Sequence, residues 1–152
     1  MIEESYSGMI YVMGGKYTTY RKIAEDCLKR IVKKKLIDTA ELYPLYGGGA
    51  VDVDVKAEAL KYKVTEEVVS HLLGTYGSRY ADVLALVKED AALKKPLIFG
   101  QSPIVAEVVY AKRVEMACFA DDIIWRRLGL GYMNAKTEAL SKEIQHYMDK
   151  YN

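Results

Sequence analysis

A short apolar run that leads into two glycines and a long amphipathic segment is the feature that most constrains this chain. Met9–Met13 reads Met-Ile-Tyr-Val-Met without polar alternation, which is typical of a strand buried on both faces inside a sheet. Gly14-Gly15 then predicts a turn, and apolar spacing predicts a helix from about Thr18 to Lys34. The N-terminus therefore resembles a strand, turn and helix from an α/β domain.

A central strand needs neighbours on both of its edges, and the chain offers few candidates. Leu97-Ile98-Phe99 is the other apolar run of strand type, and it is short and follows Pro96. We therefore expect that the sheet belonging to Met9–Met13 lies outside this sequence and that the chain is a fragment. We expect the strand to be loose or to pair with the edge of another chain.

Helical periodicity dominates the remainder of the chain, after a linker at 42–54 that contains Gly47-Gly48-Gly49. Ser78, Ser102 and Asn134 are predicted N-caps, because short polar side chains accept hydrogen bonds from the first free N–H groups of a helix. Three helices are predicted at 56–62, 66–76 and 121–128. Three more are predicted to begin after Ser78, at Ser102-Pro103 and after Asn134. The predicted fold class is mainly α, preceded by the strand–turn–helix remnant.

Composition excludes several classes of protein. The 152 residues carry a net charge of +1, which gives no field that would attract nucleic acid. The sequence has no apolar run long enough to span a membrane and no basic, apolar leader at its start. Cys27 and Cys118 form no CxxC pair and suit a reducing compartment. We expect a cytoplasmic protein without a nucleic-acid partner.

The glycine turn has a chemistry of its own. Glycines let a backbone approach a ligand closely, and the following helix directs unpaired N–H groups back at the turn. Lys16 adds a positive charge there, and Thr18 or Thr19 adds a hydroxyl. Such a turn favours phosphate, carboxylate or an electron-rich carbonyl. The alternative is an ordinary tight strand-to-helix turn capped by threonine.

A longer match starts at the same turn. The segment 14–21, Gly-Gly-Lys-Tyr-Thr-Thr-Tyr-Arg, followed by Ala24-Glu25, resembles the G-G-K-x-T-T-Y-R-x-x-A-E signature of FAD-dependent glycerol-3-phosphate dehydrogenases. A second block resembles the helical C-terminal domain of that family in order and spacing. It comprises Ala106–Tyr110, Glu115–Ala117, Asp121-Asp122 and Arg126-Arg127, with Tyr76–Ser78 and the glycines near 48 in agreement. The resemblance covers nearly the whole chain.

This resemblance implies two domains. Residues 1–36 would be the C-terminal end of the FAD-binding domain, and 45–152 the helical C-terminal domain. Gly14, Gly15 and Lys16 would lie against the flavin, and Thr18 and Thr19 would face the pyrimidine end of its ring. The helix N-terminus there would stabilise negative charge on the reduced flavin. Lys16 would assist near the flavin or the substrate phosphate.

The implied parent enzyme oxidises sn-glycerol 3-phosphate to dihydroxyacetone phosphate and passes two electrons through FAD to quinone. Its implied partners are the missing FAD-binding body of the same chain, glycerol 3-phosphate and quinone, with a second copy as a further candidate. A peripheral position on the inner face of the cell membrane is the alternative to a free cytoplasmic one. The helical domain would be a cap or accessory element that supports dimer contacts or docking of the electron acceptor.

This sequence departs from the family pattern in what it lacks. The dinucleotide-binding glycine motif, the substrate-binding arginines and the catalytic histidine of the family are absent, so no catalytic set is complete here. Gly129–Asn134 imitates the start of GxGxxG, but it has no third glycine and follows no strand. We expect this chain to bind no FAD by itself and to be inactive.

Two other functions stay open. The parent could be a glycerol-3-phosphate oxidase, which passes electrons to oxygen and forms hydrogen peroxide. The chain could instead be a free-standing helical interaction module, although the orphan strand argues against this.

The remaining polar residues have ordinary explanations. Asp121-Asp122 could be an acid/base pair, but Asp122 and Arg126 are four apart and suit a supporting ion pair. Arg126-Arg127 could meet a phosphate or another subunit, and a salt-bridged face is the simpler interpretation. Arg21 is expected to pair with a carboxylate.

His71 and His146 have no partner at ligand spacing, so we interpret neither as a metal ligand nor as a base, and we expect no metal site. Cys27 and Cys118 are interpreted as inert buried thiols. Trp125 is expected in the core or at an interface. Lys33-Lys34-Lys35 could touch anionic lipid, weakly.

Overall fold

The computed structural model describes residues 2–32, 45–133 and 137–151, and it is mainly α-helical, which confirms the predicted fold class. The chain divides into two compact units, Met1–Pro44 and Leu45–Asn152. Among the described helices, none combines the length and the apolar character needed to cross a membrane. Lys33-Lys34-Lys35, Asn134 and part of the predicted linker lie outside the described residues.

The first unit contains a small hairpin and one long helix. Strands β1 (Ile2–Glu4) and β2 (Ile10–Val12) pair antiparallel, with Glu3 opposite Tyr11. A 3₁₀ turn, η1 (Tyr17–Thr19), leads into α1 (Tyr20–Ile31). The strand at Met9–Met13 is thus confirmed in its centre, but the expectation that this chain offers it no neighbour is wrong, because β1 pairs with it.

The side chains of β2 are exposed in this chain, contrary to the prediction of a strand buried on both faces. Tyr11 and Val12 are 46% and 45% exposed, and among the described strands β2 pairs with β1 alone. None of the described residues in the first unit is buried, and the apolar residues Leu28 and Ile31 of α1 are also exposed. The described part of this unit, residues 2–32, has an amphipathic helix and a hairpin but no core.

The second unit is a bundle of helices joined by short turns. Its helices are α2 (Val55–Tyr62), α3 (Glu66–Tyr76), α4 (Tyr80–Glu89), α5 (Val105–Arg113), the π-helical turn η4 (Asp122–Arg127) and α6 (Glu138–Lys150). The 3₁₀ turns are η2 (Gly77–Arg79), η3 (Ala91–Lys94) and η5 (Leu130–Met133).

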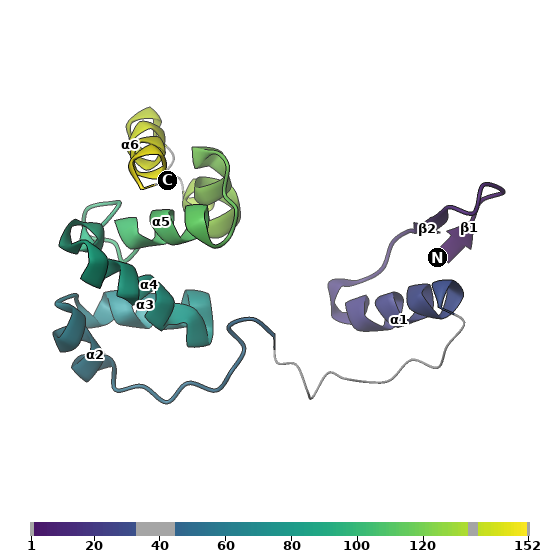
Figure 1. Cartoon of the computed structure of the whole chain (residues 1–152), viewed down its shortest axis with the longest axis horizontal. Coiled ribbons are helices and arrows are strands. Elements are labelled where there is room, and N and C mark those ends of the chain that lie inside the picture. The colour runs from purple at the N-terminus through teal and green to yellow at the C-terminus, as the bar shows by residue number, and fades with distance from the viewer. Residues whose placement is uncertain (1, 33–44, 134–136, 152) are drawn as a thin grey trace. The chain divides into compact units, whose positions relative to one another are not determined.

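Helix α5 lies at the centre of this bundle. It packs against α4 on one side and α6 on the other, as Figure 1 shows. Val105 to Ala111 are all buried, so the helix is surrounded. The core around it is formed by apolar residues of every neighbouring element, including Val68, Leu72, Val83, Leu84, Val87, Ile123, Ile124, Leu140, Ile144 and Met148.

Gly77 ends α3 as predicted, and its lack of a side chain has a second use. Its backbone is left-handed, with φ +54°, and a Cβ there would lie 2.1 Å from the carbonyl oxygen of Gly47. That carbonyl accepts a hydrogen bond of 3.0 Å from the N–H of Ser78. The glycine-rich segment before α2 is therefore fastened to the α3–α4 corner through its backbone.

The predicted N-caps differ from those in the structure. Ser78 lies inside η2, and the residue before α4 is Arg79, which makes no side-chain cap. Helix α6 is capped by Thr137, whose hydroxyl accepts the N–H of Leu140 at 3.1 Å, and not by Asn134. The Ser78 prediction rested on residue type and missed the turn η2 that precedes α4, and Asn134 lies outside the described residues.

Helix α5 also starts later than the Ser102-Pro103 signal predicted. An isolated β-bridge joins Pro96 to Ile104, and the carbonyl of Pro103 accepts the N–H of Leu97 at 2.9 Å. These contacts hold 103 and 104 extended, so the first helical residue is Val105. The strand candidate Leu97–Phe99 forms bends and a turn rather than a strand, and the bridge lies just before it at Pro96.

Candidate functional site

The glycine turn of the first unit connects β2 to η1 and α1. Gly14 and Gly15 have φ of +74° and +121°, a region that residues with a Cβ rarely adopt. A Cβ added to Gly14 would meet no atom within 4 Å, whereas one added to Gly15 would lie 2.3 Å from Cδ1 of Ile23. Gly15 thus permits close packing on α1, and Gly14 opens onto free space.

A hollow of about 560 Å³ adjoins this turn. Its walls come from the turn, from Ile2 of β1 and from one face of α1. Asp26, Lys29 and Arg30 supply the charges along that face. The volume falls within the range of small-molecule sites.

The structure brings together three of the five predicted cofactor-binding residues. Gly14, Gly15 and Thr19 line the hollow, whereas Lys16 and Thr18 are not among its lining residues. Lys16 is extended and precedes η1, and its carbonyl accepts both the N–H and the hydroxyl of Thr19, each at 2.9 Å. The Thr19 hydroxyl therefore closes the turn on itself. Arg21 approaches Glu25 at 3.7 Å, which agrees with the pairing expected for it.

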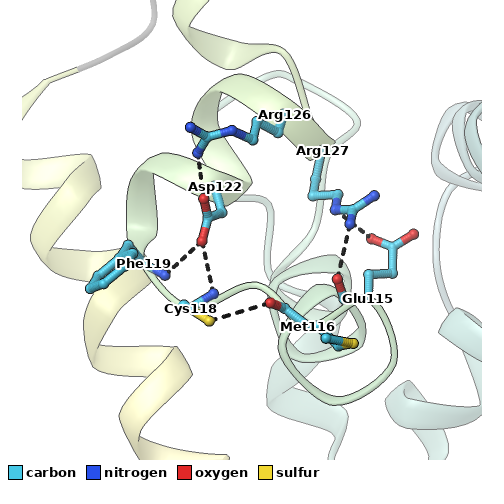
Figure 2. A network of polar contacts seen from close by, with 7 residues as sticks. All are labelled: Glu115, Met116, Cys118, Phe119, Asp122, Arg126 and Arg127. Carbon is cyan, nitrogen blue, oxygen red and sulfur yellow. Dashed lines mark hydrogen bonds and ion pairs between the residues drawn. The ribbon is translucent and has the colours of Figure 1, made fainter. Parts of the chain in front are cut away.

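In the second unit, the charged residues near 121–127 form a structural network. Figure 2 shows the carboxylate of Asp122 between Arg126 and the backbone of Cys118 and Phe119. Asp122 accepts the N–H of Cys118 at 2.8 Å and of Phe119 at 3.0 Å, and these hydrogen bonds, with Arg126, hold the pKa of Asp122 below its ordinary value. The predicted Asp122–Arg126 ion pair is confirmed.

Arg127 turns toward a different partner. Its guanidinium donates to the carbonyl oxygen of Glu115 at 2.9 Å and approaches the Glu115 carboxylate at 3.5 Å (Figure 2). Asp122 and Arg127 thus fix η4 to the segment that follows α5, whereas Arg126 pairs within η4. The salt-bridged face is confirmed, and an acid/base role for Asp122 has no support in this geometry.

A buried network that the sequence analysis missed lies between α3 and α5. Glu107 is fully buried, and its carboxylate accepts the N–H of Ile104 at 2.8 Å and the hydroxyl of Tyr76 at 3.2 Å. The His71 ring lies 3.0 Å from the same carboxylate, and this hydrogen bond raises the pKa of His71. Burial raises the pKa of Tyr76.

His71 lacks a partner Cys or His at ligand spacing, and its partner here is instead a carboxylate that lies 36 residues further along the chain. The signal was present in the sequence: Glu107 is the one charged residue within the apolar run 103–111. A carboxylate in such a helix must find partners to be buried. The arrangement orders the core, and its residues line neither the hollow beside the glycine turn nor the cleft at 63–102, so we regard it as structural.

The thiols and Trp125 occupy less buried positions than expected. Cys118 is exposed, so the prediction of a buried thiol is wrong there, because the residue lies in the irregular segment before η4. Cys27 is partly buried. Trp125 packs on the core edge with Tyr132 at 5.1 Å between ring centroids. Within the described ranges, no cluster of three or more His, Cys, Asp or Glu could hold a metal ion.

Comparison with known proteins gives a consistent match. Residues 38–151 match the family model described as the C-terminal domain of alpha-glycerophosphate oxidase. A protein of Dictyostelium discoideum named probable mitochondrial glycerol-3-phosphate dehydrogenase is 35% identical over 86% of this chain. The mitochondrial glycerol-3-phosphate dehydrogenase of Rattus norvegicus is 34% identical over 95% of it, and a glycerol-3-phosphate dehydrogenase of Synechocystis is 30% identical over 84%.

The chain spans only about a fifth of the length of the first two of these relatives, 21% of each. A match over 95% of the chain extends well beyond 38–151 and into the first unit. The similarity to the rat protein therefore includes the region of the glycine turn as well as the helical bundle.

Proposed function

The chain belongs to the family described as the C-terminal domain of alpha-glycerophosphate oxidase, and from this we propose that it works as the C-terminal part of an FAD-dependent glycerol-3-phosphate dehydrogenase. In this proposal the whole enzyme oxidises sn-glycerol 3-phosphate to dihydroxyacetone phosphate and passes the electrons through FAD to quinone. The observation that carries it is a similarity to dehydrogenases that runs through both units.

Residues 1–36 of the first unit would be the C-terminal end of the FAD-binding domain, and residues 45–152 would be the helical domain that follows it. The absence of any buried residue among those described in the first unit supports this division. Tyr11, Val12, Leu28 and Ile31 expose apolar area that a packed domain would cover. The missing FAD-binding body is the partner that would supply this cover.

The turn between β2 and α1 fits the edge of a flavin in two respects. The left-handed glycines leave the backbone open to close approach, and an adjoining hollow has the volume of a ligand site. We assign Gly14, Gly15, Lys16, Thr18 and Thr19 to this edge. FAD would supply hydride acceptance there, while Lys16 and the first turn of η1 would offer positive charge beside the ring.

A matched pair of glycine substitutions tests this assignment in the full-length enzyme. Gly8 and Gly14 both have positive φ, +80° and +74°, and a Cβ on either would meet no atom within 4 Å. Both substitutions by alanine therefore impose similar backbone strain. We expect Gly14→Ala to weaken FAD retention by about tenfold or more, and Gly8→Ala to leave it unchanged. Equal retention by both variants would contradict the assignment.

The proposed reaction is tested with the same full-length protein. Glycerol 3-phosphate should bleach the flavin absorbance, and a quinone analogue should restore it. The family description names an oxidase, so the oxygen-dependent alternative has a specific basis. Hydrogen peroxide formed in proportion to substrate would establish the oxidase, and no bleaching by glycerol 3-phosphate would overturn both.

The helical domain would support assembly or acceptor docking through the exposed charges of η4. Arg126 is 71% exposed beyond its contact with Asp122. We expect Arg126→Glu to change oligomeric state or quinone-dependent turnover. Lys142→Glu is the control, because Lys142 is 75% exposed, much as Arg126 is, and also forms an i,i+4 pair, with Glu138 in α6. The same behaviour in both variants would exclude a special role for η4.

We also propose that the enzyme acts in the cytoplasm or at the inner face of the cell membrane, where quinone would be within reach. Cell fractionation of the full-length protein distinguishes the two locations.

A further inference from the structure

We propose that the cleft bordered by Lys63, Lys94 and Gln101 in the second unit is a binding site for a small organic anion with an apolar body. The cleft encloses about 850 Å³ and lies where the α2–α3 corner faces η3 and the loop before α5. None of its lining residues belongs to the first unit. The site is therefore separate from the proposed flavin edge and does not depend on it.

The wall chemistry identifies the class of ligand. Val64, Val68, Ala91, Ala92 and Pro96 make most of the surface apolar, and Gln101 and Ser102 add a few hydrogen-bonding groups. Ligand sites are typically apolar hollows of this size with a small number of placed polar groups. An apolar body would cover the walls, whereas a small polyol phosphate would leave them wet.

Three lysines supply the charge. Lys63, Lys94 and Lys95 line the cleft from two segments that are far apart in the sequence. Lys95 already binds the Glu143 carboxylate at 2.7 Å, so its charge is compensated. Lys63 and Lys94 have no ion pair with any described residue, which leaves two ammonium groups for a bound anion.

The single carboxylate of the lining is engaged locally. Glu67 lies in the first turn of α3, where it complements the helix N-terminus. A hydrogen bond from Thr65 lowers the pKa of Glu67. Its charge is thus directed at its own helix, and the two lysines still give the cleft a net positive charge.

The backbone at Lys63 is a second, independent observation. Lys63 has φ +55° and ψ +44°, a left-handed conformation that glycine or asparagine adopts more readily at the end of a helix. The position carries a lysine, whose charge also complements the C-terminus of α2. Lys94 ends only the four-residue 3₁₀ turn η3, so a test that includes Lys94 separates ligand binding from the capping of α2.

Three probes of graded chemistry test the site on the full 152-residue chain by amide NMR. Octanoate has both an anionic carboxylate and an apolar chain. The compound 1-octanol has only the apolar chain, and acetate has only the carboxylate. At millimolar concentration, we expect octanoate to shift the amides of Lys63, Lys94, Gln101 and Ser102. Octanol and acetate should bind on the order of tenfold more weakly, because each lacks one half of the recognition.

Substitution of both lysines gives the decisive comparison. Lys63→Gln with Lys94→Gln should weaken octanoate binding on the order of tenfold. The control variant carries Lys56→Gln and Lys112→Gln, which remove the same amount of charge from lysines that do not line the cleft. This variant should bind octanoate as tightly as the parent chain does. Helical circular dichroism confirms folding. No octanoate shifts, equal binding of octanol, or equal weakening in the control would each overturn the proposal.

Discussion

At the scale of single residues, the carboxylate of Glu107 ties α3 to the start of α5. It accepts the Ile104 N–H and the Tyr76 hydroxyl and contacts the His71 ring, all while fully buried. Glu107→Ala would leave these groups without an acceptor, so we expect it to lower the free energy of unfolding by about 3 kcal/mol. Urea denaturation measures this.

Glu89→Ala is the control for that experiment. Glu89 is 61% exposed and pairs with Arg113 at the surface, so its removal should change the free energy of unfolding by at most about 1 kcal/mol. A Glu107→Ala variant as stable as Glu89→Ala would contradict the structural role assigned to the buried carboxylate.

His71 makes the stability of the second unit depend on pH. Its pKa is raised by the hydrogen bond to Glu107, and Tyr76 is the other titratable group that meets this carboxylate. The folded state therefore holds the His71 proton more tightly than the unfolded state. The extra stability is complete below the unfolded pKa of about 6.5 and is lost as pH rises through the folded pKa.

Urea midpoints measured from pH 5 to pH 9 should thus fall above about pH 6.5. In His71→Gln this fall should be much smaller, because the titrating group is gone. An unchanged slope in His71→Gln would assign the pH dependence to other groups. The sequence could not reveal this pairing, since it joins residues that only the packing of α3 on α5 brings together.

At the scale of elements, helix starts show which local signals can be trusted. Thr137 caps α6 through its hydroxyl, whereas Ser102, which has the stronger sequence signal before a proline, caps nothing. We expect Thr137→Ala to lower the free energy of unfolding by about 1 kcal/mol. Ser102→Ala should stay within about 0.5 kcal/mol of the parent. A larger loss of stability in Ser102→Ala than in Thr137→Ala would instead support the Ser102 cap that the sequence predicted.

The reason for this difference lies in tertiary contacts. The bridge between Pro96 and Ile104 keeps the chain extended past Ser102, and Glu107 takes over the capping of Ile104. Periodicity predicted the apolar faces of α3 and α4 well because burial imposes them. It could not predict the π-helical turn of η4, since Ile123 and Ile124 would be buried in an ordinary helix as well.

Strand β1 shows a similar limit. Its sequence, Ile-Glu-Glu, has no strand pattern, and this segment is a strand only because it pairs with β2 in the hairpin. The glycine turn was predictable because its residues are restricted by backbone geometry. The hollow beside it depends on how α1 faces β1, and no spacing in the sequence records that.

At the scale of the whole molecule, the two units differ in what holds them together. The second has a continuous apolar core around α5, whereas the described part of the first has no buried residue. A segment without burial gains little from the hydrophobic effect and opens locally at low cost. The apolar surface of the first unit is therefore the observation that most favours the proposed cover by an FAD-binding body.

Hydrogen–deuterium exchange of the 152-residue chain and of the full-length enzyme tests this difference. In the chain by itself, amides of β2 and α1 should exchange quickly, while those of α5 should be slow. In the full-length enzyme, β2 and α1 should slow by about tenfold or more, because cover by the FAD-binding body adds a cost to their opening. Helix α5 should change little, since its packing is already complete.

The comparison with α5 gives the measurement its control. Slow exchange of α1 in the isolated chain would mean that the first unit is stable without cover, and the free-standing module would then be the better interpretation. Slowing of β2 and α1 only after joining to the body would show that the hairpin, the glycine turn and the helix belong to the flavin domain. FAD titration of the same two samples, which should give binding in the full-length enzyme only, would then link that cover to the cofactor.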